Sequence, residues 1–160
     1  MKLTVAAATG RGRTELAAFD NALVAVGAAN FNLVRLSSVI PPHSTVVEAS
    51  DAPPRPQGTW GDRLYVVYAE RRTSIPGGQA WAGVGWVQDA TDGRGLFVEH
   101  EGDDESTVRD QIEASLEDLQ TSRGVDLGPL HLRLAGAVCV DRPICALVLC
   151  SYGSEPWSNR

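Results

Sequence analysis

Two apolar stripes with helical spacing, separated by a long stretch of strand-like sequence, constrain the fold of this chain most. The stripe in residues 13–26 consists of Leu16, Phe19, Leu23 and Val26. The stripe in residues 104–122 consists of Val108, Ile112, Leu116 and Leu119. Steps of three and four residues place each set on one face of a helix. Thr14 is a suitable N-cap and Gly27 a suitable stop for the first helix, and Gly124 is a suitable stop for the second.

Strand-like segments surround both predicted helices. They cover residues 2–9, 30–40, 64–69, 79–88, 95–101, 129–140 and 144–151. Residues 30–40 end at Pro41-Pro42, because proline cannot continue a hydrogen-bonded ladder. Residues 50–61 contain three prolines and are predicted to form a surface loop. This order predicts an α+β fold: an αββα-type sandwich with mostly antiparallel sheets and two main helices, in a single domain spanning residues 1–160.

Composition restricts the class of protein. Hydrophobic residues make up 43% of the chain and charged residues 21%, which is typical of a globular protein and excludes a wholly disordered one. The 20 acidic and 14 basic residues give a net charge of -6, the opposite sign to that expected of a nucleic-acid binder. No apolar run approaches the roughly 20 residues that span a bilayer, and the N-terminal run is shorter than a secretory signal requires. We therefore expect no nucleic-acid or membrane partner and a cytoplasmic location.

Cysteine, histidine and acidic residues do not form a recognisable metal site. The three cysteines, Cys139, Cys145 and Cys150, lie in one apolar C-terminal stretch without a second cluster, which favours buried, reduced thiols. The three histidines share no short ligand spacing. Nine acids lie between Glu99 and Asp118, and their interleaving with the apolar stripe favours a solvated helix face over a cation site. The sequence therefore predicts no metal.

Two consecutive serines end the strand-like segment before the prolines. Ser37 and Ser38 are followed at once by Val39-Ile40 and then Pro41-Pro42. A stiff turn of this kind can force a serine hydroxyl towards the preceding carbonyl, a geometry that favours an N-to-O acyl shift. The ordinary interpretation is a turn in which both hydroxyls bond to nearby backbone groups. The pattern alone leaves both interpretations open, and no common nucleophile or phosphate-binding motif accompanies it.

Three segments in order carry a resemblance to a known family. Residues 32–42 read Asn-Leu-Val-Arg-Leu-Ser-Ser-Val-Ile-Pro-Pro, residues 18–23 read Ala-Phe-Asp-Asn-Ala-Leu, and residues 95–102 read Gly-Leu-Phe-Val-Glu-His-Glu-Gly. The first resembles the self-cleavage segment of pyruvoyl-dependent arginine decarboxylases, the second their first-helix motif and the third a later strand. A final strand with Cys145 lies at family-like spacing, so the resemblance covers nearly the whole chain.

The resemblance implies an enzyme that makes its own cofactor. Ser38 would attack the carbonyl of Ser37, and elimination and hydrolysis would leave a covalent pyruvoyl group at position 38. The products would be a β chain of residues 1–37 and an α chain of residues 38–160. The pyruvoyl ketone would form a Schiff base with L-arginine and accept the electrons released with CO2, giving agmatine, a polyamine precursor.

The resemblance also implies roles for three further residues. Glu99 would protonate the α-carbon after CO2 leaves, which requires a pKa raised by burial. Asn32 would hydrogen-bond near the pyruvoyl group, and Asp20 would receive the substrate guanidinium. The active sites would lie between the subunits of a homotrimer.

Two alternatives stay open. In this family the segment after the proline-rich loop usually carries an Ala-Tyr-Gly-like run, whereas this chain has Leu64-Tyr65-Val66. One alternative is therefore pyruvoyl-dependent decarboxylation of a different amino acid. The other is an unprocessed, non-catalytic trimeric subunit of the same fold that serves in binding or assembly.

Overall fold

A computed structural model describes residues 1–49 and 56–157 of the chain. Its elements in order are β1 (Lys2–Arg11), α1 (Glu15–Ala25), β2 (Asn32–Arg35), β3 (Val39–Ile40), β4 (Thr45–Glu48), β5 (Arg63–Thr73), β6 (Gln79–Gln88), β7 (Gly95–Gly102), α2 (Glu105–Arg123), β8 (His131–Val138) and β9 (Ile144–Glu155). Of the predicted proline-rich loop, residues 50–61, the segment 50–55 lies outside the described residues.

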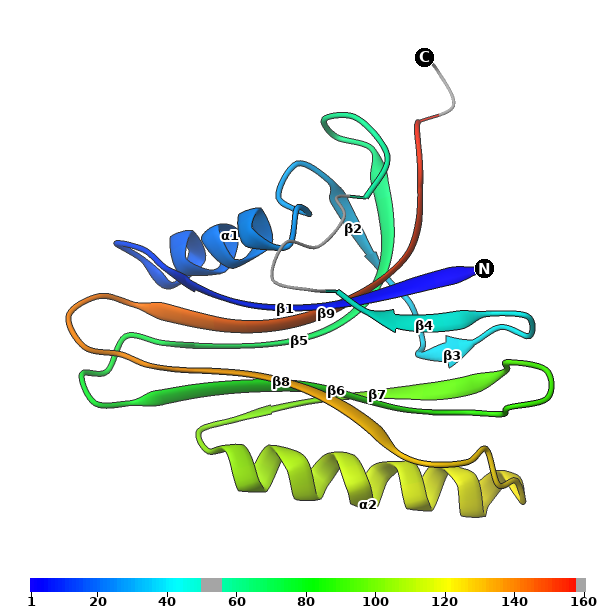
Figure 1. The fold of residues 1–160 in the computed structure, drawn as a ribbon. Helices are drawn as coiled ribbons and strands as arrows, with labels where there is room; N and C mark the ends of the chain where they lie inside the picture. Colours follow the sequence, from blue (N-terminus) through cyan, green and yellow to red (C-terminus); the bar gives the residue numbers. More distant parts are fainter. Residues whose placement is uncertain (50–55, 158–160) are drawn as a thin grey trace.

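The elements form four layers, with α1 on one outer side, two sheets in the middle and α2 on the other side (Figure 1). One sheet has the strand order β2-β5-β9-β1-β4 and the other the order β3-β7-β6-β8. The β1–β4 and β2–β5 pairings are parallel, and the other pairings in the described residues are antiparallel. This arrangement confirms the predicted α+β sandwich.

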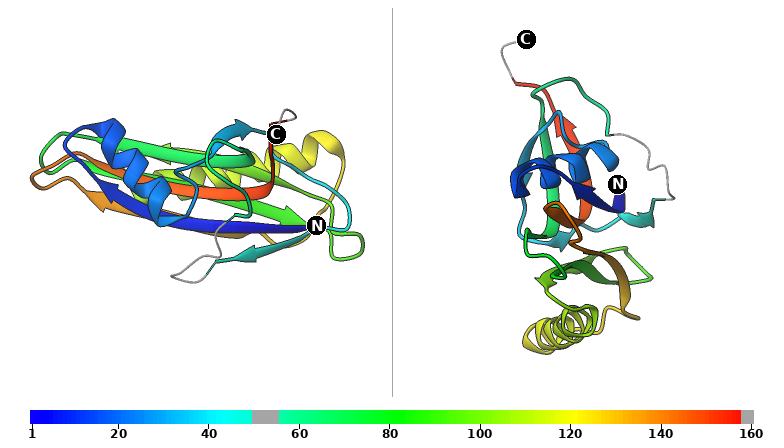
Figure 2. Two further views of the ribbon diagram at one scale, coloured as in Figure 1. Left: turned by 90° about the horizontal axis from the view of Figure 1, so that it is seen from above. Right: turned by 90° about the vertical axis from the view of Figure 1, so that its left-hand side faces the viewer.

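Each interface between layers contains its own apolar cluster. The central cluster joins the two sheets and includes Leu3, Val67 and Phe97. A second cluster lies between α1 and the five-stranded sheet, and a third lies between α2 and the four-stranded sheet. The right-hand view of Figure 2, which looks along the layers, shows the same order of α1, the two sheets and α2. Burial of these three faces supplies the hydrophobic stabilisation of the fold.

Both helices begin and end close to the predicted residues. The Thr14 hydroxyl accepts a hydrogen bond from the Ala17 amide at 3.1 Å and caps α1. Helix α2 ends at Arg123, and Gly124 has the left-handed conformation of a helix stop, with φ of 63°. Neither helix is long and apolar enough to cross a bilayer, and the described residues contain no other.

Glycines in the strands let both helices approach the sheets closely. A Cβ atom at Gly10 would lie 2.1 Å from the Ala18 carbonyl oxygen of α1. A Cβ atom at Gly85 would lie 2.2 Å from the Ile112 side chain of α2. Both positions therefore require glycine as long as the helices keep these positions.

Two predictions about local structure were wrong. Leu16 was assigned to the buried stripe of the first helix, but it is 67% exposed, and Ala18 and Ala22 occupy the buried face instead. Residues 30–40 were predicted as one strand, but the chain forms two strands in different sheets, with residues 36–38 between them. The short strand β4 was not predicted.

Candidate active site

The peptide bond between Ser37 and Ser38 lies where the chain crosses from one sheet to the other. On its N-terminal side, the Leu36 amide donates to the Val66 carbonyl of β5 at 2.9 Å. On its C-terminal side, β3 pairs with β7. The two ends of this crossing are therefore held by different sheets, which explains why the predicted single strand divides here.

Ser38 has a strained backbone that two contacts hold in place. Its φ of 67° lies in the left-handed region, which side chains other than glycine rarely adopt and which costs about 1–2 kcal/mol. The Phe97 amide donates to the Ser38 carbonyl at 2.8 Å. The Ser38 hydroxyl donates to Oε1 of Glu99 at 2.6 Å. Strained residues fixed by their surroundings in this way are often found at functional sites.

Glu99 is a largely buried carboxyl group on the inner face of β7. Its side chain is only 12% exposed. Burial raises the pKa of Glu99, and the hydrogen bond from Ser38 and the charge of Arg35 lower it by less. A raised pKa allows this carboxyl group both to accept and to donate a proton closer to neutral pH than an exposed glutamate would.

Arg35 is the cation that pairs with Glu99, and sequence reasoning did not single it out. Its Nη2 lies 3.9 Å from Oε2 of Glu99 and donates to the Tyr68 carbonyl at 2.8 Å. The guanidinium also lies 4.8 Å from the centre of the Tyr68 ring. Arg35 belongs to the segment that carries the family resemblance, so its place in that string was the available signal.

Tyr152 is a second group that the sequence did not indicate. Its hydroxyl donates to the Val39 carbonyl at 3.0 Å, although the two residues are 113 positions apart. No local pattern links a C-terminal strand to the residue after Ser38, so only the fold reveals this contact.

The structure brings Ser38 and Glu99 into contact, but neither Asn32 nor Asp20 contacts this pair. Asn32 begins β2, is exposed, and donates from Nδ2 to the Gly61 carbonyl at 2.6 Å. Asp20 is an exposed residue of α1. Helix α1 covers the outer face of the five-stranded sheet (Figure 1). Among the described residues, the Asp20 side chain has no hydrogen-bond or ion-pair partner.

A pocket of about 450 Å³ opens beside the two serines. Its lining comprises Ser37, Ser38, Leu96, Phe97, Val98, Glu99, His100, Ser115, Asp118, Leu119 and Arg123. His100 and Glu99 point to opposite faces of β7, as predicted for neighbours on a strand, and Nε2 of His100 lies 2.8 Å from Oγ of Ser115. The pocket therefore has one wall formed by the two serines and by Glu99 of β7, and a mixed polar wall on α2.

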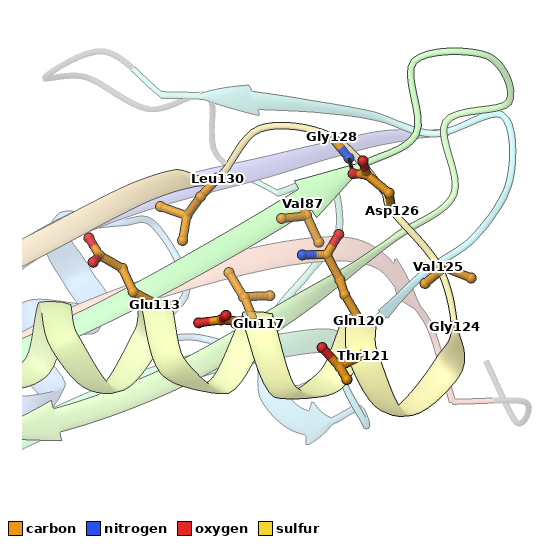
Figure 3. Close-up of a pocket in the computed structure, with 11 residues that line it drawn as sticks. Val87, Glu113, Glu117, Gln120, Thr121, Gly124, Val125, Asp126, Gly128 and Leu130 are labelled. Atoms are coloured by element: carbon orange, nitrogen blue, oxygen red, sulfur yellow. Dashed lines mark hydrogen bonds between the residues drawn. The ribbon is translucent and has the colours of Figure 1, made fainter.

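A second cavity, of about 530 Å³, lies between the C-terminal half of α2 and the chain that follows it (Figure 3). Glu113, Glu117 and Asp126 contribute carboxylates to its lining, which includes none of the predicted site residues. No group of three or more His, Cys, Asp or Glu side chains in residues 1–49 and 56–157 could hold a metal ion.

Comparison with known proteins identifies the family. The family model of pyruvoyl-dependent arginine decarboxylase matches residues 2–154. The chain belongs to the pyruvoyl-dependent arginine decarboxylase family. A protein of that name from Thermococcus kodakarensis is 34% identical over 151 residues, covering 91% of this chain and 90% of the relative. One from Halobacterium salinarum is 42% identical over 110 residues, covering 68% and 64%. One from Pyrococcus horikoshii is 38% identical over 118 residues, covering 70% and 72%.

The name of the pyruvoyl-dependent arginine decarboxylase family implies a pyruvoyl prosthetic group, and the residues around position 38 fit one. A pyruvoyl group is a small ketone joined to the chain through an amide carbonyl. The Phe97 amide already donates to the carbonyl of residue 38. The Glu99 carboxyl group and the pocket lie on the side-chain side of the same residue. The site thus provides a hydrogen-bond donor, an acid or base, and space for a substrate.

Proposed function

We propose that this protein is a self-processing decarboxylase that converts L-arginine to agmatine and CO2 with a pyruvoyl group derived from Ser38. The observation that carries the proposal is the strained Ser38, whose hydroxyl donates to the largely buried Glu99 at 2.6 Å. A structural serine requires neither the left-handed backbone nor a carboxyl group with a raised pKa. Membership of the family supports arginine as the substrate.

Self-cleavage would begin with proton transfer from Ser38 to Glu99. The Ser38 oxygen attacks the Ser37 carbonyl carbon, the peptide C–N bond breaks, and an ester joins the two residues. Loss of the Ser38 α-proton expels the Ser37 carboxylate and leaves a carbon–carbon double bond at position 38. Addition of one water and loss of one ammonia then give the pyruvoyl group. The products are residues 1–37 and residues 38–160.

The fold supports such a cleavage because it holds both new ends independently. The β-chain end is bonded to β5 through Leu36, and the α-chain start is paired with β7 through β3. Breaking the bond between Ser37 and Ser38 also releases the strain at Ser38. Both fragments therefore stay in the fold after the covalent link is lost.

Decarboxylation would use the same carboxyl group in the opposite direction. The pyruvoyl group supplies a ketone for the substrate amine and an acceptor for the electrons of the carboxylate. Glu99 then donates a proton to the substrate α-carbon, and its burial keeps the proton available. The Arg35 guanidinium pairs with Oε2 of Glu99, the carboxyl oxygen that does not bond to Ser38. The family resemblance also implies a role for Asn32, whose amide donates to the Gly61 carbonyl within its own copy. We therefore propose that Asn32 contributes to the site of a neighbouring copy.

Asp20 is proposed as the guanidinium receptor, but in a neighbouring copy's site. The outer face of α1 carries Leu16, Asp20 and Val24 at intervals of four, with Leu16 67% and Val24 56% exposed. A mostly apolar groove is lined by Val39, the residue after Ser38, and by Ile40 and Leu96. The exposed apolar residues around an unpartnered acid support a homotrimer in which α1 of one copy meets the site of the next.

Asp20→Ala should raise the KM for arginine more than it lowers kcat. Loss of a charged hydrogen-bond partner costs roughly 1.5–3 kcal/mol of substrate binding. The matched control is Asp118→Ala, which removes the α2 acid from the pocket beside Ser38 in the same copy. Steady-state kinetics of both fully cleaved variants measure the difference. A KM shift in Asp118→Ala alone would move guanidinium recognition to α2.

A reducing compartment, and hence the cytoplasm, is also proposed. Cys139, Cys145 and Cys150 are all buried and unpaired, as predicted. Burial raises the pKa of Cys145 to about 12, so this thiol stays protonated and unreactive near neutral pH.

The test of the proposed function is a denaturing mass spectrum of the purified, untagged protein. We expect two chains, residues 1–37 and 38–160, whose masses together equal the intact 17.1 kDa chain plus one water and minus one ammonia. Incubation with arginine should then release CO2 and agmatine, and lysine and ornithine should react more slowly. A chain that stays intact on long incubation would favour an unprocessed binding or assembly subunit.

A further inference from the structure

The short segment that begins at Ser38 depends on few bonds once the chain is cut. Before cleavage, residues 38–40 are joined covalently to β2. After cleavage, the backbone hydrogen bonds that hold this segment on the four-stranded sheet are the short β3–β7 pairing and the bond from the Phe97 amide to the Ser38 carbonyl, beside the burial of Ile40 in the central cluster. Strand β3 has only two residues and lies at the edge of its sheet, so the Val39 carbonyl has no partner strand on its outer side.

Tyr152 provides that missing partner from the other sheet. The β5–β9 register pairs Val66 with Ser151 and Tyr65 with Gly153, so Tyr152 is an extra residue at a β-bulge. Bulges commonly redirect side chains at functional sites. The Tyr152 hydroxyl reaches across the interface between the sheets and donates to the Val39 carbonyl at 3.0 Å.

Phe97 connects the two bonds. Its amide donates to the carbonyl of residue 38, and its ring meets the Tyr152 ring edge-on, with the ring centres 6.1 Å apart. Two consecutive carbonyls, of residues 38 and 39, are therefore held by two residues that also pack against each other. Burial raises the pKa of Tyr152 further above its ordinary value, so the hydroxyl stays protonated and remains a donor near neutral pH.

We propose that Tyr152 is a positioning residue that fixes the start of the α chain, and with it the carbonyl groups at position 38, relative to Glu99. This inference rests on the proposed function, because it assigns Tyr152 to the segment that self-cleavage creates. Tyr152 touches neither the substrate nor the reacting atoms. Its contribution is the orientation of the segment that carries them.

Tyr152→Phe tests this inference, because it removes the hydroxyl and keeps the ring that packs against Phe97. The matched control is Tyr65→Phe, which removes a second tyrosine hydroxyl from the same end of the five-stranded sheet. That hydroxyl donates to Glu155 at 2.9 Å, away from Ser38. Both variants lose one hydrogen bond, so a merely structural effect should be similar in the two.

Hydrogen–deuterium exchange on the cleaved proteins gives a readout independent of activity. In Tyr152→Phe the amides of Val39 and Ile40 should exchange about five- to tenfold faster, as expected for the loss of one hydrogen bond, while the control exchanges like the wild type. The kcat for arginine should fall by a similar factor with KM unchanged. If Tyr152→Phe has the same exchange rate and the same kcat as the wild type, this inference is wrong and the proposed function still stands. A wild-type chain that never cleaves would overturn it together with the proposed function.

Discussion

Ser38→Ala is expected to remain a single 17.1 kDa chain without decarboxylase activity. Alanine has no oxygen to attack the Ser37 carbonyl and no group to eliminate, so neither cleavage nor a pyruvoyl group can form. The fold should survive, since the Phe97 amide still has the carbonyl of residue 38 as its acceptor. Denaturing mass spectrometry measures the cleavage, and release of CO2 from arginine measures the activity.

Two further variants distinguish the nucleophile from its neighbourhood. Ser37→Ala keeps the attacked carbonyl and should still be cleaved, because the exposed Ser37 side chain has no part in the proposed step. Ser38→Cys keeps a nucleophile that can also leave and should be cleaved to some extent. Cleaved Ser38→Ala protein would refute the assignment of Ser38.

Glu99→Gln is expected to lower kcat by about 10²- to 10⁴-fold, the range for removal of a general acid. Glutamine can still accept the hydrogen bond from Ser38, so the geometry should be kept, but it cannot give a proton to the α-carbon. The measurement is kcat per cleaved chain, because Glu99 is also the proposed base for self-cleavage. A variant that is cleaved and turns over normally would assign the proton donor elsewhere.

The pH dependence gives an independent check on Glu99. Because burial raises its pKa, the acid form that donates the proton persists above the ordinary range of a glutamate and is lost as pH rises through this raised pKa. The kcat of the wild type should therefore fall over that interval, whereas self-cleavage, which needs the basic form, should accelerate. Glu101→Gln is the matched control, since Glu101 lies two residues further along β7 and pairs with Arg71 at 3.3 Å. It should keep both profiles.

Local pattern was sufficient for much of the secondary structure. Helix α2 and its stop at Gly124 follow from the spacing of Val108, Ile112 and Leu116, which are all buried. Strand β6 covers the predicted residues 79–88. These elements bury one face or both faces against a neighbouring layer, and burial of that kind leaves a period in the sequence.

Both failed predictions missed a contact with another element of the fold. Leu16 has the helical spacing of a core residue but faces away from the sheet, because Gly10 lets α1 pack through its alanines instead. Residues 30–40 look like one apolar strand. The left-handed Ser38 redirects the chain into the second sheet, and its conformation depends on β7, which lies far away in the sequence.

By itself the sequence determined the fold class, the two helices and, through the resemblance of residues 32–42, the family and the candidate serine. Tertiary structure decided what surrounds that serine. Glu99 follows Ser38 by 61 positions and Tyr152 follows Val39 by 113, and neither separation matches the period of any helix or strand. Such contacts form only when two sheets pack face to face, and the burial that results also raises the pKa of Glu99.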